Sequence, residues 1–84
     1  MGMAYQEVRE KIKVLAVFKD GTVFPHIFEW GGKRREVDKV NMSYQEREGA
    51  SINYYFAIES KGLVAKVKYN DKAMIWTMEE IWVD

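Results

Sequence analysis

Apolar and polar residues alternate along most of this chain, and this period of two limits the fold more than any other feature. Successive side chains of a β-strand point to opposite faces of the sheet, so the alternation predicts strands with one face toward a core. Five segments show the pattern: residues 11–19, 23–30, 51–59, 63–69 and 74–78. Turn-forming pairs separate them: Asp20-Gly21, Gly31-Gly32, Lys61-Gly62 and Asn70-Asp71. Short strands punctuated in this way predict an all-β fold.

The length of the chain allows one domain of this kind. A chain of 84 residues buries only about 60–65% of the surface that it exposes when unfolded, so its stability margin is thin. We predict a single small β domain over residues 1–84, with five to six antiparallel strands in a small SH3-like barrel; an OB-like barrel and a curled open sheet are the alternatives. Residues 1–10 are expected to be disordered, a short helix or a frayed strand extension. We also expect a mobile loop at 45–50 and a bulge near residues 38–39, where the alternation breaks.

The first hairpin is expected to turn through three residues. A loop of residues 19–21, with its glycine in the left-handed conformation, sets Ala16 opposite Phe24. This register places Phe24, His26 and Phe28 together on the core face. Both strands then turn their apolar sets to the same side of the sheet.

The later hairpin is expected to turn through two residues. A loop of Lys61-Gly62 sets Phe56 opposite Val67 and Ile58 opposite Ala65. All four side chains then lie on one face of the sheet. Pattern and turn chemistry agree in this hairpin, which is the strongest sequence evidence for the fold.

The run of three basic residues at 33–35 raises the question of nucleic-acid binding. A two-glycine turn before it sets Arg34 opposite Glu29 on the outer face and Arg35 opposite Phe28 on the aromatic face. Because the basic side chains then lie on both faces, they do not form one patch. The favoured interpretation is an ordinary solvated hairpin, in which Arg34 and Glu29 form a cross-strand ion pair.

The alternative is weak, salt-sensitive nucleic-acid binding through the 30–39 hairpin. Arg35 on an aromatic face is costly unless it is paired or lies at an opening. An aromatic floor with an arginine at its rim is also how single strands are stacked and neutralised. The candidate residues are Trp30, Lys33, Arg35, Lys66 and Lys68. Equal numbers of basic and acidic residues, 13 of each, argue against a protein whose main task is to hold polyanions.

Nothing in the sequence predicts catalysis or metal binding. His26 is the one histidine and there are no cysteines, so a zinc site would need an unusual set of carboxylates. The serines lie outside any nucleophile elbow, and no helix follows the glycine turns to hold a phosphate. We therefore expect a protein that is not an enzyme, with no catalytic residues, no cofactor and no metal.

Apolar residues on the outer faces of the strands predict a contact surface instead. Leu15 and Val17 lie on the outer side of the first strand, and Tyr55 points away from the core toward the side expected for Trp82. Exposed apolar patches on small domains often mark partner or self-association surfaces. The first functional hypothesis is a non-enzymatic binding module that contacts an unknown protein partner, or forms a homodimer, through Leu15, Val17, Tyr55 and Trp82.

The expected location is cytoplasmic. No apolar run approaches the roughly 20 residues that a membrane span needs, so no membrane partner is expected. The first ten residues also lack the apolar segment of a signal peptide.

Several motifs occur in a suggestive order: P-H-I-F-E-W-G-G-K-R-R-E-V-D-K-V at 25–40, Y-Y-F at 54–56, L-V-A-K-V-K-Y at 63–69, and a late tryptophan. From Lys11 onward this order resembles a group of small bacterial all-β domains of unknown function. Some relatives of that kind occur beside DNA-repair polymerases, so the resemblance implies a nucleic-acid or polymerase-partner role and supplies no catalytic residues. Arg35 stands where the pattern has an aromatic residue, which implies a more polar barrel mouth in this chain.

Overall fold

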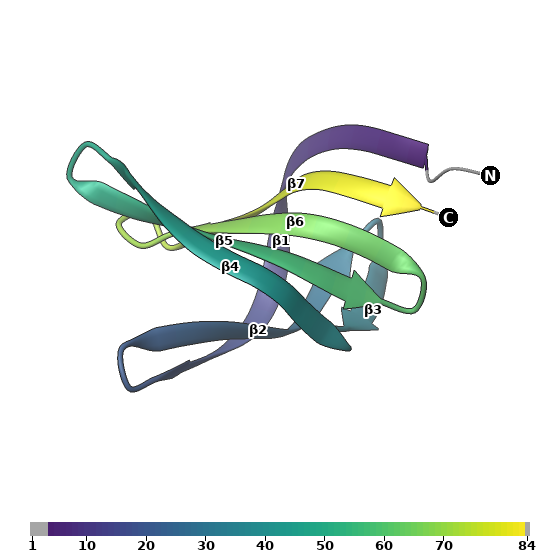
Figure 1. The fold of residues 1–84 in the computed structure, drawn as a ribbon, viewed down its shortest axis with the longest axis horizontal. Coiled ribbons are helices and arrows are strands. Elements are labelled where there is room, and N and C mark those ends of the chain that lie inside the picture. The colour runs from purple at the N-terminus through teal and green to yellow at the C-terminus, as the bar shows by residue number, and fades with distance from the viewer. Residues whose placement is uncertain (1–3, 84) are drawn as a thin grey trace.

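The protein is a single antiparallel sheet that curls into a half-barrel (Figure 1). The computed structural model describes residues 4–83. Its strands are β1 (Ala4–Lys19), β2 (Thr22–Trp30), β3 (Lys33–Glu36), β4 (Lys39–Glu48), β5 (Ser51–Ser60), β6 (Leu63–Asn70) and β7 (Ile75–Val83). They lie in the order β3-β2-β1-β7-β6-β5-β4. The all-β antiparallel prediction is confirmed in the form of the curled open sheet. The closed SH3-like barrel of five to six strands is wrong, because β3 and β4 remain as edges of an open seven-stranded sheet, and an OB-like barrel is not observed.

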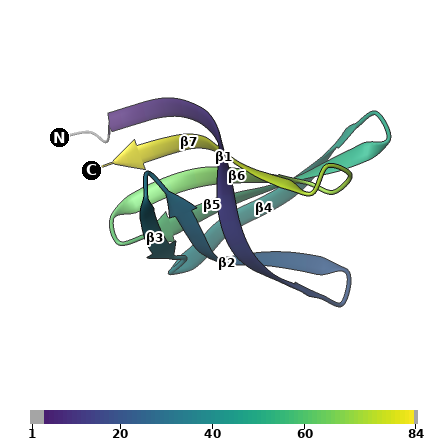
Figure 2. The same ribbon diagram turned by 180° about the vertical axis from the view of Figure 1, so that it is seen from behind.

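A bend in β1 produces the curl. Residues 4–12 of this strand pair with β7, whereas residues 13–19 pair with β2. The change follows a register shift between Glu7 and Glu10, where Arg9 has a positive φ of 52°. Figure 2 shows β1 crossing from one ladder to the other in front of the sheet. Residues 4–10 thus belong to a strand, and residues 1–3 lie outside the described residues.

The chain passes directly from one edge of the sheet to the other between β3 and β4. The Val37 N–H donates to the His26 carbonyl at 2.8 Å, and the Asp38 N–H donates to the Glu59 carbonyl at 2.8 Å. The two residues therefore tie β2 to β5 at one end of the half-barrel. The bulge expected near residues 38–39 is a crossing at 37–38, and the register shift in β4 falls later, between Val40 and Met42.

The core lies mainly on the inner face of β5, β6 and β7. Buried apolar side chains from these strands alternate with half-buried ones, as a period of two requires. Aromatic rings fill much of the volume, with Trp76 packed 4.9 Å from Tyr69 and 5.9 Å from Phe56 between ring centroids. The buried apolar residues are Val23, Phe28, Phe56, Ile58, Leu63, Ala65, Val67, Tyr69, Trp76, Met78 and Ile81.

The two later register predictions are confirmed. Phe56 lies opposite Val67, and Ile58 opposite Ala65, across the two-residue turn between β5 and β6. In the β2–β3 hairpin Glu29 pairs with Arg34 and Phe28 with Arg35. Uninterrupted alternation and a two-residue turn were sufficient to fix the β5–β6 ladder, whereas the two-glycine turn alone fixed the β2–β3 ladder.

The register predicted for the first hairpin is wrong. Asp20 and Gly21, with φ of 52° and 76°, form a two-residue turn, which pairs Val17 with Phe24 and Ala16 with Pro25. Two-residue hairpin loops favour this geometry, with positive φ at both positions, because its twist matches that of the strands. Phe24 is therefore on the outer face. A register shift opposite residues 15–16 then brings Phe28 back to the core.

The polar segment 45–50 is a hairpin rather than a loop. β4 pairs with β5 as far as Glu48, and residues 49–50 form the turn. Side-chain amides support this end of the sheet: Asn53 donates to Glu48 at 2.7 Å, and Asn70 donates to Asn53 at 2.7 Å. The sequence pattern did not predict this strand, because an edge strand with little core contact needs no apolar alternation.

Candidate functional site

An apolar ladder lies on the outer face of the β1–β2 hairpin. Leu15 pairs with Ile27 and Val17 with Phe24, so the four side chains point away from the core together. Leu15 is 56% exposed, Val17 43% and Phe24 48%. The structure thus places two predicted contact residues, Leu15 and Val17, on one exposed surface. Phe24 was not predicted as a contact residue, because the expected register placed its side chain on the core face.

The other two predicted contact residues lie on a different surface. Trp82 is on β7, half-buried opposite Val64, with its ring 5.3 Å from that of Tyr5. Tyr55 is on β5 and stacks on Tyr44 at 4.9 Å. Two of the four predicted residues therefore lie on the β1–β2 hairpin, and the other two lie on the outer face of the part of the sheet formed by β4, β5, β6 and β7.

Lys66 covers the stacked tyrosine pair on this second surface. Its Nζ lies 5.1 Å from the centre of the Tyr55 ring and 5.5 Å from that of Tyr44. The side-chain interaction with Tyr44 raises the pKa of Lys66 above its ordinary value. Burial, together with the nearby Glu46 carboxylate, raises the pKa of the Tyr55 hydroxyl. A cation packed against two rings leaves Tyr55 less available to a partner than its outward direction suggested.

The five predicted nucleic-acid residues are not brought together either. Lys66 and Lys68 lie on the outer face of β6, where Lys68 forms an ion pair with Glu79 at 3.9 Å. The Trp30 indole donates to the Glu10 carboxylate at 3.0 Å. Only Lys33 and Arg35 share a site.

That site is a basic pocket of about 280 Å³ between the β2–β3 and β5–β6 turns. It is lined by Lys33, Arg34, Arg35, Glu36, Ser60 and Lys61. The Arg35 Nε is buried and has no hydrogen-bond partner among the described residues. Arg34 and Glu29 are opposite each other as predicted, but within residues 4–83 ion pairs form only at Arg9–Glu7 and Lys68–Glu79. The lining therefore includes four basic residues and one acidic residue, but Arg34 alternates to the face of β3 opposite Lys33 and Arg35.

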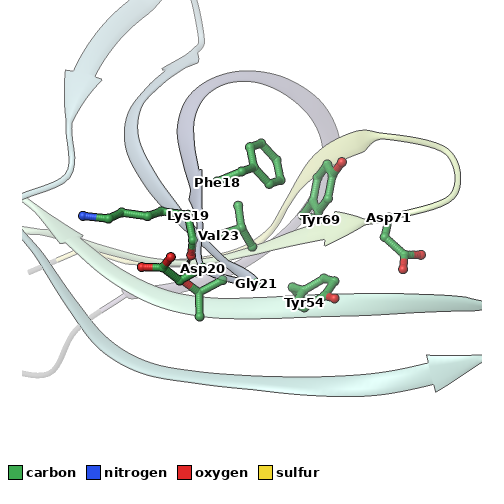
Figure 3. A pocket seen from close by; sticks show the side chains of 9 residues that line it. Phe18, Lys19, Asp20, Gly21, Val23, Tyr54, Tyr69 and Asp71 are labelled. Atoms are coloured by element: carbon green, nitrogen blue, oxygen red, sulfur yellow. Dashed lines mark hydrogen bonds between the residues drawn. The ribbon is translucent and has the colours of Figure 1, made fainter.

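An aromatic pocket lies at the opposite end of the half-barrel, where the β1–β2 hairpin approaches β5 and β6. It has a volume of about 380 Å³, and its apolar walls are Phe18, Val23, Tyr54 and Tyr69. Figure 3 shows Phe18 and Tyr69 side by side, Tyr54 below them and Asp71 at the rim. Phe18 and Tyr69 are the last core-facing residues of their strands, and such positions lie at the mouth of a curled sheet.

Residues 4–83 contain no cluster of three histidine, cysteine or acidic side chains that could hold a metal ion. Nor do they contain a helix long and apolar enough to cross a bilayer.

The chain matches no protein-family model, no curated protein and no solved structure. The resemblance to small bacterial all-β domains therefore stays a prediction.

Proposed function

We propose that this protein is a non-enzymatic binding module that pairs with a second copy of itself through the outer face of the β1–β2 hairpin. The observation that carries the proposal is the apolar ladder of Leu15, Val17 and Phe24, each more than 40% exposed. Neighbouring large apolar side chains on a small domain favour association, because contact removes them from water.

A second copy of the chain can cover the ladder, because the same apolar patch is present on both copies. Lys19 pairs with Thr22 at one end of the ladder, and Lys13 pairs with Glu29 at the other, where Arg34 also lies opposite Glu29. A two-fold axis through the centre of the ladder brings Lys19 of one copy to that second end of the other copy. The Glu29 carboxylate stands among cations there, so the apolar contact rather than the rim charges supports an isologous dimer.

Light scattering on the wild-type chain and two charge variants tests the proposal. We expect a wild-type dimer that Val17→Glu converts to a monomer, because the new carboxylate would be buried against an apolar surface. Met42→Glu is the matched control, since Met42 is 59% exposed and belongs to β4, which pairs with neither β1 nor β2. A wild-type chain that stays monomeric at high concentration, or a Met42→Glu chain that dissociates equally, would overturn the proposal.

The basic pocket favours a second candidate function, the binding of nucleic-acid phosphates. The charged groups of Lys33, Arg35 and Lys61 supply donors from which a phosphate oxygen can accept. We expect labelled single-stranded oligonucleotides to bind at low salt, and the affinity to fall as salt rises.

Two variants separate this pocket from general electrostatic attraction. Arg35→Leu should abolish the anisotropy change, whereas Lys72→Met, which removes an exposed lysine from the β6–β7 turn, should preserve most of it. An equal loss of oligonucleotide affinity in the two variants, or an affinity that does not change with salt concentration, would rule out the pocket as the phosphate site.

A further inference from the structure

The aromatic pocket is built by residues that are far apart in the sequence. Phe18 lies near the end of β1, Tyr54 near the start of β5, and Tyr69 near the end of β6. The turns of the β1–β2 and β4–β5 hairpins lie at this same end of the molecule (Figure 1). The pocket thus exists only because the sheet curls, and it opens at the end of the half-barrel away from the basic pocket.

The rings of the pocket differ in how firmly the core holds them. Tyr69 is 7% exposed and packs against Trp76, so its ring is fixed from behind. Phe18 meets Tyr69 edge-to-face at 5.6 Å, yet it is 61% exposed. Tyr54 lies 6.3 Å from Tyr69 on the other side. Three rings around one opening, one of them largely in water, form a surface that a ligand of suitable chemistry can cover.

The charges at the rim indicate the sign of that ligand. Asp20 and Asp71 both line the pocket, and the Asp71 Oδ1 accepts a hydrogen bond from the Ile52 N–H at 2.8 Å, which holds the carboxylate in place. Neither aspartate forms an ion pair within the described residues. Lys19 also belongs to the lining, but Figure 3 shows its amine extending away from the rings. The rings therefore have the Asp71 carboxylate at their rim and no ammonium over their faces, and the Asp20 carboxylate, like the Lys19 amine, is directed away from them.

We propose that the aromatic pocket binds an organic cation of the alkylammonium class. The faces of Phe18, Tyr54 and Tyr69 attract a cation through their quadrupoles, and methyl groups on nitrogen suit their apolar surface. Asp71 supplies the opposite charge. A free anion is disfavoured by this carboxylate, and a neutral ligand of the same shape loses both attractions. A binding site of this kind is independent of self-association and of phosphate binding.

Calorimetric titration with choline and with 3,3-dimethylbutan-1-ol tests the charge requirement. The two molecules have nearly the same shape, but only choline carries a positive nitrogen. We expect choline to bind about tenfold or more tightly than the neutral alcohol. Equal affinities, or no detectable binding of either choline or a peptide that contains trimethyl-lysine, would overturn the proposal.

Two pairs of variants place the binding in this pocket. Phe18→Leu should weaken choline binding, whereas Phe24→Leu should not, because Phe24 is similarly exposed but lies on the outer face. Asp71→Asn should also weaken it while keeping the oxygen that accepts from Ile52, and Lys72→Met should leave it unchanged. A loss in Phe24→Leu equal to that in Phe18→Leu would contradict the assignment.

The same cation can come from a free metabolite or from a methylated lysine side chain. Titration with a short peptide containing trimethyl-lysine, and with its unmodified counterpart, distinguishes the two sources. Binding of the methylated peptide more tightly than choline indicates a side chain as the ligand, and the reverse indicates a free amine. Preference for the unmodified lysine would argue against the alkylammonium class.

Discussion

The β5–β6 and β1–β2 hairpins share the same turn chemistry and yet occupy very different environments. Both turn through two residues with positive φ, Lys61-Gly62 in one and Asp20-Gly21 in the other. β5 and β6 are flanked by β4 and β7 over most of their length. The tip of the β1–β2 hairpin extends past its neighbours, because the ladder with β7 stops at Ile12 and the ladder with β3 starts at Ile27.

The difference shows that the neighbours of a hairpin, rather than its local sequence, decide what its side chains can do. The β5–β6 hairpin supplies six of the 11 buried apolar residues. The tip of the β1–β2 hairpin exposes Val17, Phe18 and Phe24. Side chains in the first hairpin stabilise the fold, whereas those in the second are available to ligands and partners.

The largest expected effect separates the two hairpins by stability. Ile58→Ala removes a side chain that is 1% exposed, and we expect it to lower the free energy of unfolding by about 2–5 kcal/mol. In the Val17→Glu background, where the chain is expected to be a monomer, Leu15→Ala should change it by less than about 0.5 kcal/mol, because Leu15 is 56% exposed. Urea unfolding followed by tryptophan fluorescence measures both. Similar losses would show that the outer face of the β1–β2 hairpin is covered in the folded protein.

A smaller effect is expected at Arg35 of β3, because this residue places a charged group against the core. Its Nε is buried without a partner and its strand position faces Phe28. Arg35→Leu should therefore raise the free energy of unfolding by about 1 kcal/mol, since an unsatisfied buried donor is removed. The exposed neighbour is the control, and Arg34→Leu should be close to neutral. A clear loss of stability in Arg35→Leu would mean that the guanidinium has a structural role.

How far the sequence could predict these regions follows from the same comparison. The alternation through β5 and β6 has no interruption, so one register alone buries the apolar set. In β2 both Val23 and Phe24 are apolar, so either register gives the hairpin an apolar face. The turn type and the register shift after Pro25 decide between them, and alternation does not reveal either feature.

The candidate sites show a related limit of sequence analysis. Leu15 and Val17 could be assigned to the outer face, because that depends only on their own strand. The aromatic pocket could not be predicted, since it brings Phe18 to Tyr54 and Tyr69 through a curl that starts at Arg9. A positive φ at an arginine is a tertiary effect that the residue type does not predict.

The turns themselves allow a still smaller test. Lys61 has a positive φ of 44°, which costs free energy in a lysine, whereas an aspartate such as Asp20 tolerates this conformation. Lys61→Asn should raise the free energy of unfolding by about 0.5–1 kcal/mol, because Asn-Gly is the preferred pair for such turns. Asp20→Asn should have almost no effect. Equal gains in both variants, measured by thermal unfolding, would show that the two turns are equally strained.

The smallest expected effect is an alkaline loss of stability that arises on the β5–β6 hairpin. The folded protein holds the pKa of Lys66 above its ordinary 10.5 and that of Tyr55 above 10.0. In the unfolded chain both groups lose their protons at a lower pH than in the folded protein. The stability that they contribute is therefore complete below about pH 10 and falls as the pH rises further. Both side chains are half-buried at the surface of the sheet, where solvent still screens their charges and keeps the effect small.

Urea midpoints measured from about pH 8 to about pH 11 test this sign. The decline above pH 10 should be shallower in a Tyr55→Phe, Lys66→Met double variant, because neither titrating group remains. Lys72→Met, which removes a lysine from the β6–β7 turn, should keep the wild-type slope. A double variant with the full wild-type decline would place the alkaline-sensitive contacts elsewhere in the sheet, and the packing of Lys66 over the tyrosine pair would then contribute nothing measurable to this hairpin.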